Sequence, residues 1–144
     1  MLLGELSAFD AAFPRFLLST GLAALLLLTA CAVYVLLTPW KELALVKKGN
    51  TSAGVALAGA VGGLAMPIAS TLASSVSLPE LVLWGAIALL MQLITYRIVD
   101  LILRDIPRRI SDDEIGAAVL LAAAKLGTGL IFAAGLWDPV LQRI

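Results

Sequence analysis

Four stretches of about twenty mainly apolar residues, joined by short polar segments, dominate this sequence. A helix needs about 20 such residues to cross the hydrocarbon core of a bilayer, so each stretch predicts one membrane-spanning helix. The predicted spans run from Phe16 to about Thr38, from about Ser52 to Ala73, from just after Pro79-Glu80 to about Leu103, and from about Ile115 to Leu136. Unpaired strands cannot exist in lipid. We therefore expect an all-α fold, a four-transmembrane-helix bundle that forms a single membrane domain over residues 1–144.

The composition supports lipid as the solvent and narrows the classes of partner. Charged residues make up 14% of the chain, hydrophobic residues 61%, and the mean hydropathy is +1.03; a soluble domain carries about a quarter charged residues. The formal net charge of zero argues against a nucleic-acid partner. The chain has one cysteine and no histidine, so we expect no disulfide framework, no zinc or haem site and no cofactor.

Lysine and arginine are distributed unevenly over the connections. The first connection holds Lys41, Lys47 and Lys48, and the third holds Arg104, Arg108 and Arg109. Arg97 lies near the end of the third span, just ahead of the third connection. The opposite side has Arg15 and Arg143. The positive-inside rule places the two basic loops in the cytoplasm and both termini outside.

Two features near the N-terminus allow other interpretations. Leu28-Thr29-Ala30-Cys31 is similar to a bacterial lipoprotein cleavage box, and cleavage there would remove the first span. However, the apolar run continues from Ala32 to Leu37, where a lipoprotein normally has a polar tether. Residues 1–15 could place several apolar side chains on one helical face, which predicts a short interfacial segment or a frayed terminus.

The second half of the chain is similar to the first at an offset of about 63 positions. Each half has a long apolar helix, a basic loop and a helix rich in small residues. We therefore predict a tandem repeat of a two-helix unit, with units 16–75 and 79–137, related by an axis along the membrane normal. Gly49-Asn50 and Asp112-Asp113-Glu114 occupy equivalent positions before a helix, where they are expected to cap free backbone N–H groups.

Lys125 lies near the middle of the fourth predicted span, where a charge costs about 3 kcal/mol on insertion scales. Gln92, Tyr96 and Asp100 follow one another at four-residue spacing on the third span and form a polar stripe. We expect Lys125 to lie inside the protein, with Gln92 or Asp100 as its nearest polar neighbour. Such a network either fixes helix packing or lines a wet pathway, and the sequence leaves both open.

Small residues recur along the second span. Gly54, Gly59, Gly62 and Gly63 fall at helical spacing and predict close helix packing, in our interpretation partly between subunits of a homo-oligomer. Pro67 should kink this helix, and the hydroxyl groups of Ser70, Thr71, Ser74 and Ser75 are available to the freed carbonyls.

Several of these features together resemble the YjfL-like family of bacterial inner-membrane proteins (domain of unknown function 350). The features are Lys48-Gly49-Asn50, Pro67, Ser74-Ser75 ahead of Trp84, Gln92 and Ala133-Ala134, within a stretch from about Leu25 to Leu136. The resemblance implies a tandem two-helix repeat in the bacterial inner membrane and an association with envelope-stress systems; it implies no established activity. Asp112-Asp113 replaces Gly-Asn in the second unit, and Lys125 matches nothing in the family pattern.

Two functional hypotheses follow. The first is a non-enzymatic, oligomeric component of envelope stress and membrane homeostasis that recruits cytoplasmic envelope-stress proteins to the basic loops. The second is a small oligomeric channel or carrier with Lys125 and Gln92 along its pathway. We expect no enzyme, because the chain lacks a nucleophile–base pair and a phosphate-binding loop.

Overall fold

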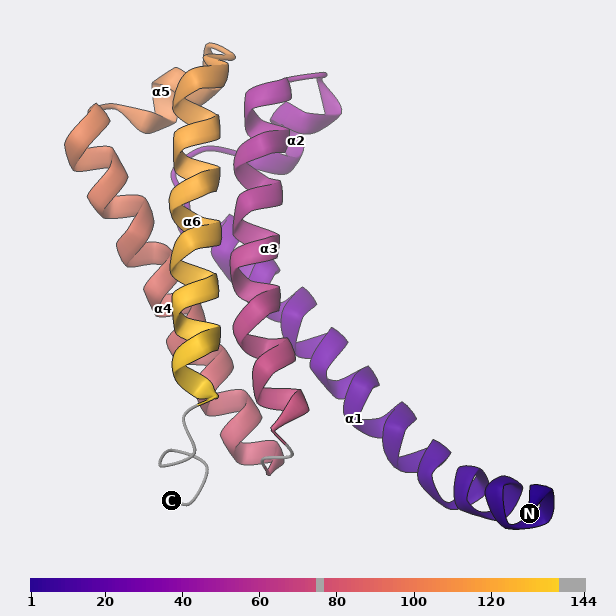
Figure 1. Ribbon diagram of the computed structural model, residues 1–144. Coiled ribbons are helices and arrows are strands. Elements are labelled where there is room, and N and C mark those ends of the chain that lie inside the picture. Colours follow the sequence, from indigo (N-terminus) through magenta and orange to yellow (C-terminus); the bar gives the residue numbers. More distant parts are fainter. Residues whose placement is uncertain (75–76, 138–144) are drawn as a thin grey trace.

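The protein is a helical bundle from which the N-terminal part of one long helix projects (Figure 1). This computed structural model describes residues 1–74 and 77–137, so Ser75 and Arg143 lie outside the described residues. The described residues form α1 Leu2–Leu37, α2 Glu42–Lys47, α3 Thr51–Ala73, α4 Leu78–Leu103, α5 Ile106–Ser111 and α6 Ile115–Leu136. The long helices α1, α3, α4 and α6 are long and apolar enough to cross a membrane, which confirms the four predicted spans.

Helix α1 begins earlier than the sequence predicted. Residues 1–15 do not form a separate segment, because the helix runs unbroken from Leu2 through Pro14 to Leu37. A proline removes one helical hydrogen bond, and a membrane helix tolerates that loss. The 36 residues of α1 are about 54 Å long at 1.5 Å per residue, well beyond a hydrocarbon core of about 30 Å. All residues from 1 to 18 are exposed, so this end of α1 has no partner in the bundle.

Helices α3 and α6 run side by side in the same direction and form the centre of the bundle (Figure 1). A side chain on Gly59 would place its Cβ 2.5 Å from the Ala122 Cα atom, and one on Gly63 would lie 2.7 Å from the Lys125 carbonyl oxygen. The two backbones can approach this closely only because small residues face each other. The predicted close packing is therefore present, and Gly59 and Gly63 contribute to it within one chain.

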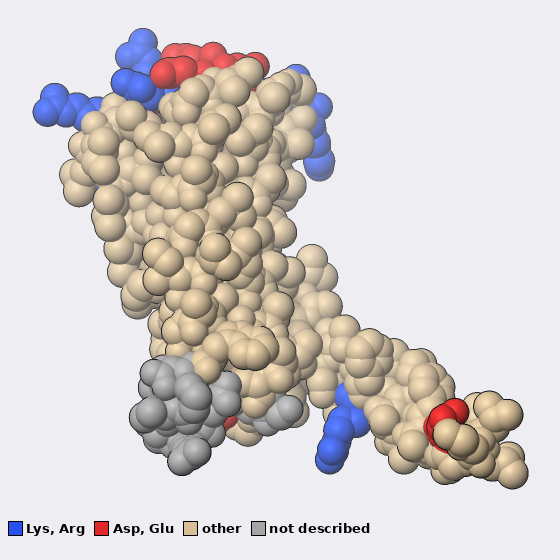
Figure 2. Space-filling view, viewed as in Figure 1, with Lys and Arg blue, Asp and Glu red and all other residues tan. Residues whose placement is uncertain are grey.

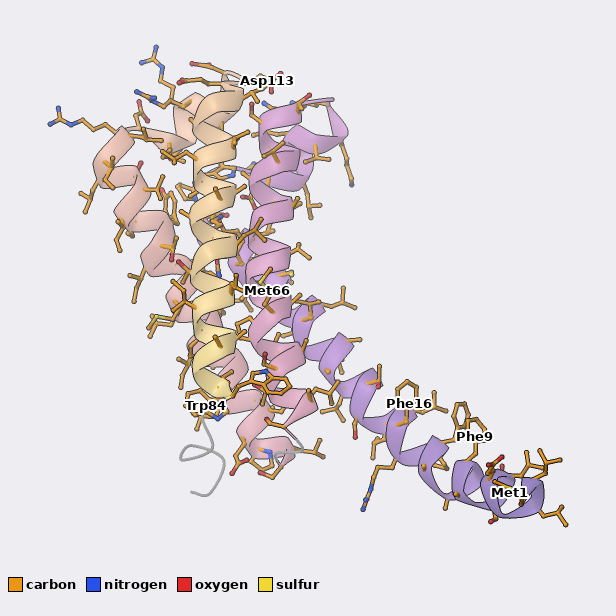
Figure 3. All side chains as sticks on the ribbon, in the orientation of Figure 1. Met1, Phe9, Phe16, Met66, Trp84 and Asp113 are labelled. Carbon is orange, nitrogen blue, oxygen red and sulfur yellow. The ribbon has the colours of Figure 1, made fainter. Side chains whose placement is uncertain are left out.

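The two halves of the chain exchange hydrogen bonds at the start of α3 and α6. The Asn50 side chain accepts from the Ala53 N–H at 2.8 Å, as predicted for a cap, and donates to the Ile110 carbonyl at 2.9 Å. Asp113, labelled in Figure 3, accepts from the Ser52 N–H at 2.8 Å. Asp113 therefore caps α3, whereas we predicted that it would cap its own helix. The tertiary fold brings the first turn of α3 within its reach.

The basic connections contain short helices that the sequence analysis treated as loops. Helices α2 and α5 each have six residues, too few for a periodic pattern to be recognised. Ile106 and Ile110, one turn apart on α5, are fully buried. Arg104 and Asp105 have φ angles of 57° and 58°, which places the chain in the left-handed region and reverses its direction between α4 and α5.

Pro67 lies inside α3, which continues to Ala73. The Thr71 hydroxyl donates to the Pro67 carbonyl at 2.8 Å, and the Ser74 hydroxyl donates to the Thr71 carbonyl at 2.9 Å. At this end of the bundle the Trp137 indole donates to the Ser70 hydroxyl at 3.0 Å, which connects α6 to α3. The hydroxyl groups beyond Pro67 are therefore used within the protein.

Candidate functional site

Lys125 is fully buried at the centre of the bundle, with 0% of its surface exposed. Its amine donates a hydrogen bond to the Tyr34 hydroxyl of α1. The same amine lies 4.2 Å from the centroid of the Tyr34 ring and 5.9 Å from that of Trp40. Aromatic faces attract a cation most strongly where water is excluded. Two rings and one hydroxyl therefore surround the charge that the sequence placed in the membrane.

The structure corrects the predicted partners of this amine. Gln92 does contact Lys125, but its amide donates to the Lys125 carbonyl oxygen at 3.2 Å and not to the amine. Asp100 is engaged elsewhere, because its carboxylate accepts from the Ile106 N–H at 2.9 Å. The amine instead reaches Tyr34, which precedes it by 91 positions. Nothing local in the sequence indicates that α1 packs over α3 and α4 in the way that brings Tyr34 to the Lys125 amine.

Tyr96 belongs to the same interior without contacting the amine. Its ring packs edge-on against Trp40, with centroids 5.0 Å apart. The exposed Arg97 guanidinium lies over the Tyr96 ring, 5.7 Å from its centroid. The predicted stripe thus divides: Gln92 contacts α6, Tyr96 supports Trp40, and Asp100 holds the start of α5.

Gln92 occupies the junction of three helices. It comes from α4, donates to α6, and lies so close to Gly63 of α3 that a Cβ there would be 2.8 Å from the Gln92 amide carbon. Its carbonyl oxygen is buried and has no hydrogen-bond partner among the described residues. One turn further along α4, the Thr95 hydroxyl donates to the Thr128 hydroxyl at 2.9 Å. Polar contacts therefore join α4 to α6 at two successive levels.

Glu42 and Trp40 are interior residues that the sequence analysis did not identify. Glu42 lies beside basic residues just after a predicted span, where an exposed side chain is expected. Its side chain is instead 0% exposed, and Trp40 is 3% exposed. Burial raises the pKa of the Glu42 carboxyl to about 7. The neighbouring lysines predict an exposed residue. Its burial could not be predicted, because the sequence analysis treated α2 as a loop.

The charged side chains gather at the end of the bundle where α2 and α5 lie, and an uncharged belt separates them from the other end (Figure 2). We call this end the rim and define its cations as Lys41, Lys47, Lys48, Arg104, Arg108 and Arg109, most of which are exposed. Arg108 pairs with Asp112 at 3.7 Å and Arg109 with Glu114 at 3.1 Å. Within the described residues the other four rim cations form no ion pair.

The described residues contain no group of three or more acidic, cysteine or histidine side chains with metal-binding geometry. The hydrogen bond from the Ser52 backbone lowers the pKa of Asp113, which is consistent with a structural capping role for its carboxylate.

Comparisons with known proteins give one family. The family described as Domain of Unknown Function (DUF350) matches residues 7–136. The UPF0719 inner membrane protein YjfL of Escherichia coli K12 is 32% identical over 102 residues, which cover 71% of this chain and 77% of that protein. The protein of the same name from E. coli O157:H7 gives the same values. No solved structure gives a significant match to this chain.

Proposed function

Because this chain belongs to the DUF350 family and is a multi-pass inner-membrane protein, we propose that it is a non-enzymatic, oligomeric component of envelope stress and membrane homeostasis. In this role it recruits cytoplasmic partners to its rim. The observation that carries the proposal is the rim itself, where Lys41, Lys47, Lys48 and Arg104 form no ion pair within the described residues. Exposed, unneutralised cations next to a membrane favour acidic proteins and anionic headgroups.

The interior of the protomer supports recruitment over transport. Lys125, Gln92 and Glu42 have exposures of 0%, 1% and 0%, so none of them lines an open passage in this conformation. The amine of Lys125 is occupied by Tyr34, and the α3–α6 contact is closed by glycine and alanine. A conduit would need these polar groups to face water. The resemblance to the YjfL-like family is what connects the proposal to envelope stress.

The internal repeat is part of the same proposal. Asn50 and Asp113 hold equivalent positions in the two units, and each bonds to the backbone of the other unit. Gly59 faces Ala122 at the same offset. In an isologous dimer, residues near the two-fold axis contact the equivalent residues of the other unit. We infer that units 16–75 and 79–137 form an intramolecular dimer, with the rim built from one short helix of each.

We also propose that the protein is a homo-oligomer. The contact surface between subunits is not the whole set of α3 glycines that the sequence suggested. Gly59 and Gly63 are used within the chain, whereas Gly54 and Ala58 lie on a partly exposed side of α3. We therefore expect Gly54→Leu or Ala58→Leu to weaken association, and Gly127→Leu on the α6 surface to leave it unchanged. Mass photometry of nanodisc or mild-detergent samples measures this. A monomer of the unaltered protein would contradict the proposal.

Complementation in cells tests the recruiting role. Bacteria lacking this protein should tolerate dissipation of the membrane potential less well, and the wild-type gene should restore tolerance. A variant with Lys47→Gln, Lys48→Gln and Arg104→Gln should fail to do so at equal abundance. Arg15→Gln, at the far end of α1, is the matched control and should complement. Full complementation by the rim variant would rule out recruitment through these charges.

The second candidate is a small oligomeric channel or carrier with Lys125 and Gln92 along its pathway. It requires another conformation in which these two buried groups face water. If the protein conducts, proteoliposomes should show a flux that Lys125→Met abolishes without lowering the melting temperature. Absence of any ion or proton flux from a homogeneous oligomer would remove this candidate.

A further inference from the structure

Glu42 is the one fully enclosed carboxyl among the described residues, and it has no partner there. Its exposure is 0%, and neither of its oxygens accepts a hydrogen bond of ordinary geometry. The Trp40 side chain is close enough to lower the pKa of this carboxyl, but burial raises that pKa by more. It forms no ion pair within 4.0 Å in this part of the chain. The indole N–H of Trp40, two positions earlier, is also buried without a hydrogen-bond partner. An ionised carboxylate in such a place loses its hydration and gains no compensating contact.

The surrounding helices do not neutralise this carboxyl. The ionisable side chains that face this region are Cys31 and Tyr34 from α1, Tyr96 from α4 and Lys125 from α6. Helix α3 contributes none, and Lys47 of α2 is exposed. Among the described residues Lys125 is the one enclosed basic side chain, and it directs its amine to Tyr34. Protonation is therefore the simplest way for Glu42 to remain buried.

Glu42 is also the buried residue of its helix. The other residues of α2 are exposed or partly buried, although Leu45 packs against core residues of the bundle and α2 contacts α3. A helix attached in part through a carboxyl packs best when the carboxyl is neutral. Ionisation favours movement of the side chain toward water and so weakens the packing of α2, while Leu45 and the contact with α3 oppose that movement.

We propose that Glu42 is a proton-binding site inside the bundle, and that proton occupancy controls whether α2, with the adjoining lysines of the rim, stays packed. The elevated pKa of about 7, which burial produces, places the change near physiological pH. The inference goes beyond the proposed function and does not require a bound partner. If it holds, a change of internal pH alters the shape of the rim.

Infrared spectroscopy of the whole protein in nanodiscs tests proton binding directly. Between about pH 5 and about pH 9, the C=O band of a protonated carboxyl should disappear with a midpoint near 7. Glu42→Gln should abolish this transition. Glu114→Gln, which removes an exposed carboxyl of the same rim, is the matched control and should leave it unchanged. A transition that persists in Glu42→Gln, or no transition near neutral pH, would overturn the assignment.

Hydrogen exchange tests the effect on α2 at one fixed alkaline pH, where intrinsic exchange rates are equal. The amides of α2 should exchange at least several-fold faster in the wild type than in Glu42→Gln, while those of α5 should not differ. Equal α2 exchange would overturn control of packing by the proton. Repeating the infrared titration with sodium replaced by N-methylglucamine identifies the ligand. A midpoint that shifts with sodium would show that sodium competes with the proton at Glu42 and would overturn a site that binds the proton alone.

Discussion

At the residue scale, a charge in the membrane is tolerable because of what surrounds it. The Lys125 amine has a hydroxyl acceptor and two aromatic rings within reach, and it is sealed from lipid. Removing the Tyr34 hydroxyl and removing the Lys125 amine should therefore affect stability differently. Loss of the partner leaves a buried donor unsatisfied, whereas an apolar residue of similar length needs none.

We predict that Tyr34→Phe lowers the free energy of unfolding by about 1–3 kcal/mol, because the buried amine loses its acceptor. The double variant Tyr34→Phe with Lys125→Met should be near neutral, because both partners are then apolar, and Tyr34→Phe should cost little in the Lys125→Met background. Reversible unfolding in mixed micelles measures the wild type and the three variants as a double-mutant cycle. Tyr96→Phe is the control, since no hydrogen bond joins that hydroxyl to Lys125 in the structure. Additive effects of the two substitutions would mean that the Tyr34–Lys125 bond contributes nothing.

Gly59 sets how closely α3 and α6 approach. An added Cβ would lie 2.5 Å from the Cα atom of Ala122, and backbone cannot move aside as a flexible side chain can. Gly59→Ala should therefore destabilise the protein by about 1–3 kcal/mol. Gly127→Ala is the matched control, because nothing lies within 4 Å of its added Cβ. Thermal unfolding in detergent compares them, and equal melting temperatures would show that the two helices separate easily.

At the element scale, the helices of the two halves stabilise each other's ends. Asp113 caps α3 and Asn50 reaches the end of α5, so each half supplies hydrogen bonds that the other half lacks. These reciprocal hydrogen bonds join the first turn of α3 to the end of α5 and to the connection before α6, on the side of the rim. They also explain why the acidic cluster contributes to structure although it is exposed.

We predict that Asp113→Ala lowers stability at neutral pH and that this deficit shrinks in acid. The hydrogen bond from Ser52 lowers the folded pKa of Asp113 below its ordinary 3.8. A lowered carboxyl pKa contributes stability above the unfolded value, and that contribution is lost as the pH falls through the folded value. Unfolding midpoints measured from neutral to acidic pH should therefore converge for the two proteins. A deficit that is constant with pH would disprove the linkage.

At the scale of the whole molecule, the rim and the uncharged belt orient the bundle. All rim cations lie at the end where α1 and α4 finish and α3 and α6 begin (Figures 1 and 2). On the opposite side α1 extends beyond the other helices, and its Phe9, Phe13 and Phe16 rings stack with centroids 5.1 and 6.5 Å apart. Phe9 and Phe16 project from the same side of this helix (Figure 3).

We predict that both termini face away from the cytoplasm, because the positive charge of the rim is retained on the cytoplasmic side. Alkaline phosphatase fused after Ile144 should be active, and a fluorescent protein fused there should be dark. A fusion in the connection after α5, at Asp112, should show the reverse. A bright C-terminal fusion would invert the orientation and with it the proposed site of recruitment.

The sequence by itself determined the membrane environment, the four spans and the basic character of two connections, because hydrophobic length and charge are properties of local composition. It also indicated that Lys125 would be enclosed and that Asn50 would cap α3. Only the tertiary structure decided the partners: Tyr34 rather than Asp100 for the lysine, Ser52 for Asp113, and burial for Glu42. These contacts join residues that are distant in the chain. They depend on how α1 packs over α3 and α4, α2 over α3, and α3 against α6, which no local periodicity specifies.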